Sequence, residues 1–130
     1  MTQANDRLIG PVPASIVNSA RSSVAPYEGR VGEYNVAVWL HLPGLANLPV
    51  SLMVRYRDGS QVREVAVDHG KVNAHHKVML SGIARLPMKS KIEDMQVRLR
   101  SAVPAQPLIV EELFVQAVEL QESANRQALA

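Results

Sequence analysis

Hydrophobic and polar residues alternate along three consecutive stretches between positions 34 and 68. Such alternation is typical of half-buried β-strands, because successive side chains of a strand point to opposite faces. The first stretch predicts an inner row of side chains: Tyr34, Val36, Val38, Leu40 and Leu42. The second predicts a second inner row: Val50, Leu52, Val54 and Tyr56. Its outward row is Ser51, Met53, Arg55 and Arg57. We therefore expect a meander of three antiparallel strands.

The pair Asp58-Gly59 lies between the second and third stretches and predicts a two-residue hairpin turn. Glycine and aspartate suit such a turn because they tolerate positive φ better than most residues. The turn would set Tyr56 opposite Gln61 and bring apolar pairs onto the inner face. A three-residue turn is the alternative, and it would shift the third strand by one residue and reverse its faces.

Further strands are expected on both sides of this meander. The first 33 residues are rich in proline, serine and glycine, and short edge strands are expected near residues 8–12 and 15–18. Residues 77–84 alternate and predict a strand that Pro87 ends, with Gly82 at a bulge or a close approach of two backbones.

The last two elements differ in how clear their pattern is. Residues 92–101 alternate regularly and predict a strand. Residues 108–121 carry apolar pairs at intervals of four, which is helical spacing, but they are rich in β-branched and aromatic residues. We expect a strand to about Leu120, with a helix as the alternative.

About eight short strands separated by turn signals predict an all-β fold, a two-sheet antiparallel β-sandwich of the jelly-roll or immunoglobulin-like kind. We expect one domain, with residues 34–120 as its core and residues 1–33 as an N-terminal segment that belongs to it. Residues 121–130 are expected to be a tail, frayed or folded as a short C-terminal helix.

One part of the chain resembles a known family. Residues 92–101 followed by 108–120 resemble the closing strand pair of jelly-roll domains of the carbohydrate-binding-module type. In that family an exposed loop precedes a last strand that carries an acidic residue, here Glu111-Glu112, ahead of alternating apolar residues. The resemblance implies a sandwich fold and glycan binding.

Composition excludes several classes of function. The chain has no cysteine, so it has neither disulfides nor thiol chemistry, and its formal net charge of +2 is not typical of a nucleic-acid-binding protein. It carries no glycine-rich phosphate loop and no hydrolase or metalloprotease motif. We expect a non-catalytic protein without a cofactor. No signal peptide or membrane span is recognised, so we expect a cytoplasmic protein, although a mature exported form would look the same.

The only tryptophan, Trp39, is the strongest candidate for a binding residue. Alternation places it outward beside His41, and the meander sets it opposite Met53. Because tryptophan and methionine are enriched at interface cores, these three residues predict a patch for a protein partner or for a homodimer. The alternatives are that a loop or a second layer covers the indole, or that a sugar stacks on it.

Four arginines form a second candidate site, for an anion or a glycan: Arg55, Arg57, Arg98 and Arg100. Guanidinium groups bind phosphates, carboxylates and sulfates in bidentate fashion if they share one sheet face. The alternative is an ordinary solvated face, with Glu64, Glu93 and Asp94 as partners. As an alternative function, Trp39, His41, Arg55 and Arg57 together would recognise a polysaccharide.

Three of the four histidines and one carboxylate lie within nine residues: Asp68, His69, His75 and His76. These groups are metal ligands when their side chains converge. Adjacent histidines point to opposite faces of an extended segment, so we expect a loop without a metal, or a loop that responds to pH.

Overall fold

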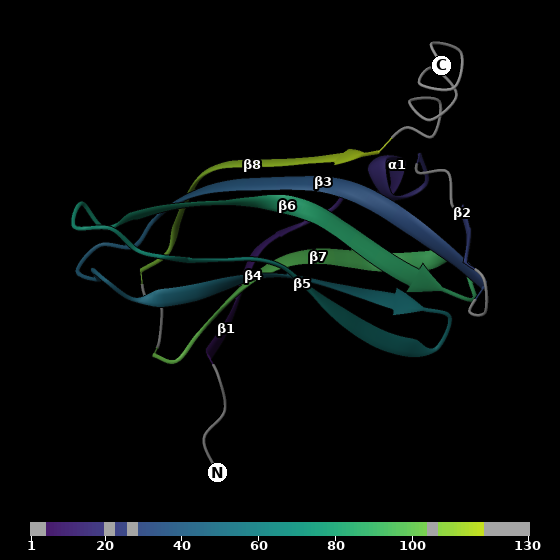
Figure 1. Ribbon diagram of the computed structural model, residues 1–130, viewed down its shortest axis with the longest axis horizontal. Coiled ribbons are helices and arrows are strands. Elements are labelled where there is room, and N and C mark those ends of the chain that lie inside the picture. Colours follow the sequence, from purple (N-terminus) through teal and green to yellow (C-terminus); the bar gives the residue numbers. More distant parts are fainter. Residues whose placement is uncertain (1–4, 20–22, 26–28, 104–106, 119–130) are drawn as a thin grey trace.

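The computed structural model describes residues 5–19, 23–25, 29–103 and 107–118. In these residues eight strands and one short helix form two antiparallel sheets packed face to face (Figure 1). The elements are β1 Asn5–Pro11, α1 Ala14–Val17, β2 Ser23–Ala25, β3 Gly29–His41, β4 Pro49–Asp58, β5 Gln61–Lys71, β6 Lys77–Met88, β7 Ile92–Ser101 and β8 Ile109–Ala117. This arrangement confirms the all-β sandwich that the alternation predicted.

The strands divide into two sheets of four. Sheet A has the order β1-β7-β4-β5. Sheet B has β3 between β6 on one side and both β2 and β8 on the other. β3 begins at Gly29, so the segment expected to precede the core already supplies strands to both sheets. In the described residues no helix is long and apolar enough to cross a membrane.

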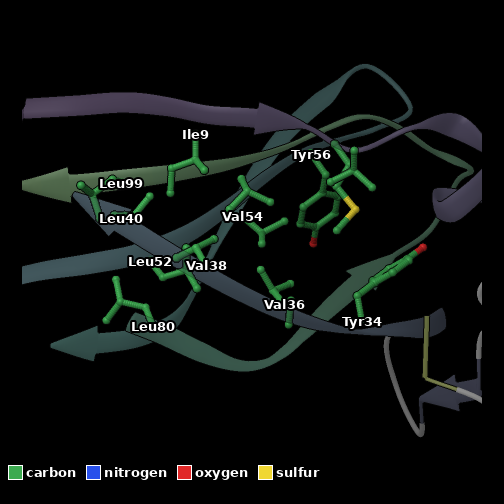
Figure 2. Packing of buried hydrophobic residues seen from close by; sticks show 14 of the residues in the cluster. Ile9, Tyr34, Val36, Val38, Leu40, Leu52, Val54, Tyr56, Leu80 and Leu99 are labelled. Carbon is green, nitrogen blue, oxygen red and sulfur yellow. The ribbon is translucent and has the colours of Figure 1, made fainter. Parts of the chain in front are cut away.

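The hydrophobic core lies between the two sheets, where the inner rows of their strands meet (Figure 2). Both predicted inner rows are buried, and the residues involved are less than 4% exposed: Tyr34, Val36, Val38, Leu40, Leu42, Val50, Leu52, Val54 and Tyr56. Strand β7 contributes Met95, Val97 and Leu99 by the same alternation. Burial of each of these side chains contributes roughly 1.5–3 kcal/mol by transfer of apolar surface from water.

The predicted meander is wrong in one respect. β3 and β4 are not hairpin partners, because the connection between them carries the chain from sheet B to sheet A. That connection turns at Gly44 and Asn47, which both have positive φ. The neighbours of β3 are instead β6 and β8, which come later in the sequence.

The β4–β5 hairpin forms, but its turn is displaced. The turn residues are Gly59 and Ser60, and Asp58 stays in the strand opposite Gln61. The predicted pairing of Tyr56 with Gln61 is therefore wrong by two residues. As far as Met53 the shift is two, an even number, so the side chains there keep their predicted faces. A bulge between Leu52 and Met53 then changes the register by one more residue, so that Leu52 pairs with Asp68 and Val50 with Gly70.

The structure decides three further predictions, on residues 15–18, on Pro87 and on residues 108–121. Residues 15–18 were expected to be a strand, but α1 occupies this region: Pro13 is its N-cap, and the Pro13 carbonyl accepts the Ile16 and Val17 N–H groups. The expectation that Pro87 ends this strand is wrong, because β6 continues through Pro87 to Met88. β6 lies at the edge of sheet B, where a residue without an N–H is tolerated, and the Pro87 carbonyl accepts the Tyr56 hydroxyl. β8 is a strand, which confirms that choice over a helix. The expected tail at 121–130 lies outside the described residues.

Sheets A and B approach each other closely where β5 passes β6. A Cβ atom on Gly82 would lie 2.8 Å from the Val67 carbonyl oxygen, which confirms the expected close approach. The Ser81 N–H donates to the Asp68 carboxylate at 2.9 Å and joins the two strands at this point. The sandwich is thus closed on its β5–β6 side.

Candidate functional site

Large apolar side chains gather on the outer face of sheet B. They come from its three longest strands and are about half exposed, at 46–52%: Trp39 on β3, Met79 and Ile83 on β6, Ile109 and Phe114 on β8. We call these five residues the sheet-B face. A contiguous group of this kind differs from scattered apolar residues, which are normal on any protein surface.

Strand register brings these side chains together. Trp39 pairs directly with Met79, and Ala37, two residues before Trp39 on the same face, pairs with Phe114. Asn35, one step further along β3, pairs with Ile83. Residues opposite one another on neighbouring strands share a face, with Cβ atoms about 5 Å apart. The alternation that buries the inner row of β3 therefore forces all of these side chains outward.

The middle of the face is hollowed into a shallow depression of about 250 Å³. Ala37, Ser81 and Gly82 form its floor, because their side chains are small or absent. Ile83 and Phe114 form walls on either side. The depression offers an apolar surface with a few backbone and hydroxyl groups at its base.

Charged side chains lie toward the ends of the face. Lys77 and Glu111 form an ion pair of 3.3 Å at one end, and Arg85 and Glu33 form one of 3.1 Å at the other. Exposed pairs of this kind contribute little stability, about 0–1 kcal/mol. Nearer the centre, Glu112 stands opposite Trp39 in the register. Apart from Glu112, the face thus has an apolar centre, and its ends are charged.

The structure confirms the outward position of Trp39, but Met53 does not accompany it. Trp39 is 48% exposed on sheet B, with His41 two residues further along the same strand. Met53 faces outward from the other sheet, in register with Arg98, and is only 8% exposed. Because β3 and β4 belong to different sheets, the expected Trp39–Met53 patch does not exist. Met79 takes its place opposite Trp39.

Three of the four candidate arginines form one cluster on the outer face of sheet A. Arg55, Arg98 and Arg100 surround the Asp6 carboxylate at 3.0, 3.0 and 2.9 Å. Glu64 pairs with Arg100 at 2.6 Å and with Arg55 at 3.2 Å. Their guanidinium groups are therefore matched by carboxylates from β5 and β1. Glu64 was anticipated as a partner, whereas Asp6 was missed because it is remote in sequence.

The electrostatics of this cluster follow from its geometry. Burial alone would raise the pKa of Asp6, but hydrogen bonds from Arg100 and Arg98 outweigh it and lower that pKa. Hydrogen bonds to Glu64 and Asp6 raise the pKa of Arg100. Arg57 stands apart and pairs with Glu93 at 3.1 Å and with Asp94 at 2.6 Å.

The proposed combination of Trp39 and His41 with Arg55 and Arg57 is wrong as a single site. The first two residues lie on the outer face of sheet B, and the arginines lie on the outer face of sheet A. The hydrophobic core separates the two faces, so no single ligand contacts both groups through the sandwich.

The histidine-rich segment is engaged in local contacts. Asp68 accepts hydrogen bonds from the Ser81 and His69 N–H groups. A ring nitrogen of His69 lies 2.8 Å from the Ser51 hydroxyl. The His76 ring contacts the Leu45 carbonyl at the same distance, and His75 is exposed. Within the part of the chain that the structure describes, no three potential ligands converge as a metal site would require.

Comparison with known proteins adds to the description of the fold. No family model and no curated protein sequence matches the chain. Among solved structures, it is similar to the Clostridium thermocellum endo-1,4-β-D-xylanase 10B CBM22-1-GH10 modules complexed with xylohexaose, with a TM-score of 0.53 and 15% identity. That match covers 67% of this chain and 17% of the other. The CBM22-2 xylan-binding domain of Paenibacillus barcinonensis Xyn10C matches with a TM-score of 0.46 and 12% identity, over 89% of this chain and 88% of that domain. The first likeness supports the resemblance to β-sandwiches of the carbohydrate-binding-module type at the level of the fold.

Proposed function

We propose that the protein is a non-catalytic binding module that associates with a protein partner through the sheet-B face, with a second copy of the chain as the first partner to test. One observation carries this proposal: five large apolar side chains on three adjacent strands are about half exposed. Soluble proteins rarely leave such a group facing water unless something binds it.

The chemistry of the face favours a protein over a small polar ligand. Tryptophan, phenylalanine and methionine are the residue types enriched at the centres of protein interfaces, where charged residues are depleted. The ion pairs Lys77–Glu111 and Arg85–Glu33 lie at the two ends, as the polar rim of an interface would. His41 borders the face from the same strand as Trp39.

The free energy gained by burying the sheet-B face supports a second copy as the partner. Completing the burial of one half-exposed apolar side chain contributes roughly 1 kcal/mol, half the value for full burial. One sheet-B face therefore supplies about 5 kcal/mol, which is close to the lower limit of the cost of association, estimated at 4–15 kcal/mol. Two such faces packed on each other supply about 10 kcal/mol. An apolar partner surface is therefore needed, and a second copy has one.

Light scattering over a range of protein concentrations tests this proposal. The wild-type mass should rise with concentration, and Trp39→Ala should remain a monomer while it still unfolds cooperatively in urea. Val62→Ala is the matched control, because Val62 is an exposed apolar residue at 65% on β5 of the other sheet. A wild-type mass that stays monomeric, with no protein partner recovered, would contradict the proposal. Outright unfolding of Trp39→Ala would instead assign the indole a structural role.

A second candidate function is glycan binding on the same face. Two aromatic rings, Trp39 and Phe114, are half exposed on neighbouring strands, and Asn35 and Ser81 add polar groups at the depression. Sugars stack on aromatic rings while their hydroxyls bond to such groups. The likeness to a xylanase structure determined with xylohexaose adds a specific ligand to test.

Titration with xylohexaose and a glycan array separate the two candidates. Glycan binding predicts saturation by an oligosaccharide at a constant monomer mass, and loss of this binding in Phe114→Ala. Protein association predicts no response on the array and a mass that depends on concentration.

A further inference from the structure

A second concave site lies beside α1, apart from the sheet-B face. It is a cavity of about 510 Å³ between the end of α1, the start of β3 and the turn that joins β6 to β7. Three basic side chains line it: Arg30 from β3, and Lys89 and Lys91 from the turn. Its volume lies in the range typical of small-molecule sites, about 300–1,000 Å³.

The charge of this cavity is unbalanced. No carboxylate is among its lining residues, and in the described part of the chain no ion pair involves Arg30, Lys89 or Lys91. Other arginines behave differently, because each of the following is paired with an acid: Arg55, Arg57, Arg63, Arg85, Arg98 and Arg100. Three uncompensated cations around one hollow attract an anion more strongly than lysines scattered over a convex surface.

Two buried polar contacts hold the walls of the cavity in place. The Asp58 carboxylate accepts the Lys89 and Ser90 N–H groups at 2.7–3.1 Å, and its side chain is only 2% exposed. On the other wall the Tyr34 hydroxyl donates to the Val17 carbonyl at 2.7 Å. Figure 2 shows this hydroxyl directed out of the core toward the helical turn. The backbone that presents the cations is therefore fixed by the fold.

We propose that this cavity binds a small organic anion that carries a carboxylate, sulfate or phosphate group. Arg30 would grip two oxygen atoms of the anion through its planar guanidinium, and Lys89 and Lys91 would supply compact positive charge. Asn18 and Ser90 also line the cavity and offer neutral hydrogen-bond donors for the rest of the ligand. The site does not depend on the sheet-B face, so either proposal can fail without the other.

Calorimetric titration tests the site with three probes: inorganic phosphate, glucuronic acid and a sulfated oligosaccharide. Binding should weaken at least about tenfold when salt is raised from about 0.05 to about 0.5 M, because the cations are exposed to solvent. The double variant Lys89→Ala/Lys91→Ala should lose binding, since both lysines are exposed and the fold does not need them. Lys71→Ala is the matched control, an exposed lysine outside the cavity, and it should bind as the wild type does.

Each outcome decides the proposal. Salt-sensitive binding that is lost in the double variant and kept in both Lys71→Ala and Trp39→Ala supports the cavity. Binding that survives in the double variant, or that Lys71→Ala weakens equally, overturns it in favour of diffuse attraction to a basic surface. No heat with any of the three probes overturns it as well. Preference for the organic probes over inorganic phosphate identifies an anionic sugar as the source of the charge.

Discussion

Asp58→Asn should destabilise this fold strongly, although it hardly changes the size of the side chain. The Asp58 carboxylate is buried and joins three parts of the chain: it accepts N–H groups from Lys89 and Ser90, and the Arg63 side chain at 3.0 Å. In the asparagine variant one oxygen becomes an amide NH₂ group. That group faces donors only, so at least one N–H loses its acceptor.

The magnitude follows from these contacts. Hydrogen bonds to a charged group contribute about 1.5–3 kcal/mol, and a buried donor without an acceptor costs about 1–3 kcal/mol. Arg63 is 30% exposed and regains water, which limits the loss. We therefore expect the free energy of unfolding to fall by about 2–3 kcal/mol. The control is Asp94→Asn, because the Asp94 side chain is 63% exposed and its surface ion pair contributes about 0–1 kcal/mol.

Urea unfolding measures the stability of both variants, and the same measurement at low pH provides an independent check. Burial alone would raise the pKa of Asp58, but hydrogen bonds from Lys89, Ser90 and Arg63 outweigh it and lower that pKa. The pKa of Asp58 in the folded protein lies below its value of 3.8 in the unfolded chain. The carboxylate therefore contributes its full stabilisation above pH 3.8, and this contribution is lost as the pH falls through the folded-state pKa. The difference in the free energy of unfolding between the wild type and Asp58→Asn should therefore become smaller in acid. A loss below about 0.5 kcal/mol at neutral pH, or a gap that stays constant in acid, would refute this reasoning.

Two further substitutions test how the sheets and the helical turn are held. Gly82→Ala should lower the free energy of unfolding in urea by about 1–3 kcal/mol, because its Cβ would lie 2.8 Å from the Val67 carbonyl oxygen. The control is the adjacent Ser81→Ala, and an equal loss of stability in the two variants would contradict the argument. Tyr34→Phe should cost about 1 kcal/mol, because the Val17 carbonyl loses its donor. Burial raises the pKa of Tyr34 to about 12, so absorbance titration should detect its ionisation only above that of an exposed tyrosine; ionisation near 10.0 would contradict this.

The local pattern of the sequence predicted the strands and their inner faces well. Alternation is set by the strand itself, so the inward position of Val38 and the outward position of Trp39 could be read without knowing any neighbour. The same holds for Leu99 in β7. The choice of strand over helix at Phe114 depended instead on the β-branched and aromatic residues of that segment, because its apolar spacing is helical. These features depend on one segment at a time, and the core confirms them.

Strand pairing could not be read in the same way. Trp39 meets Met79 and not Met53, because the 42–48 connection changes sheets and β6 returns to pair with β3. Sequence proximity favours hairpins, whereas the pairing that forms is the one that buries both inner rows together. The β4–β5 turn is displaced because Asp58 stays in the strand, where its carboxylate accepts hydrogen bonds from the Lys89 and Ser90 N–H groups in the turn after β6. Asp6 likewise reaches Arg98 from the other end of the chain.

The most direct test of the sheet-B face uses the fluorescence of Trp39, the only indole in the chain. In a dilute monomer the half-exposed ring should emit at long wavelength, as a partly hydrated indole does. Raising the protein concentration should shift this emission to shorter wavelength in step with the mass measured by light scattering, and dilution should reverse the shift. Emission that stays unchanged at every concentration, with and without xylohexaose, would contradict the claim that this face is a binding surface.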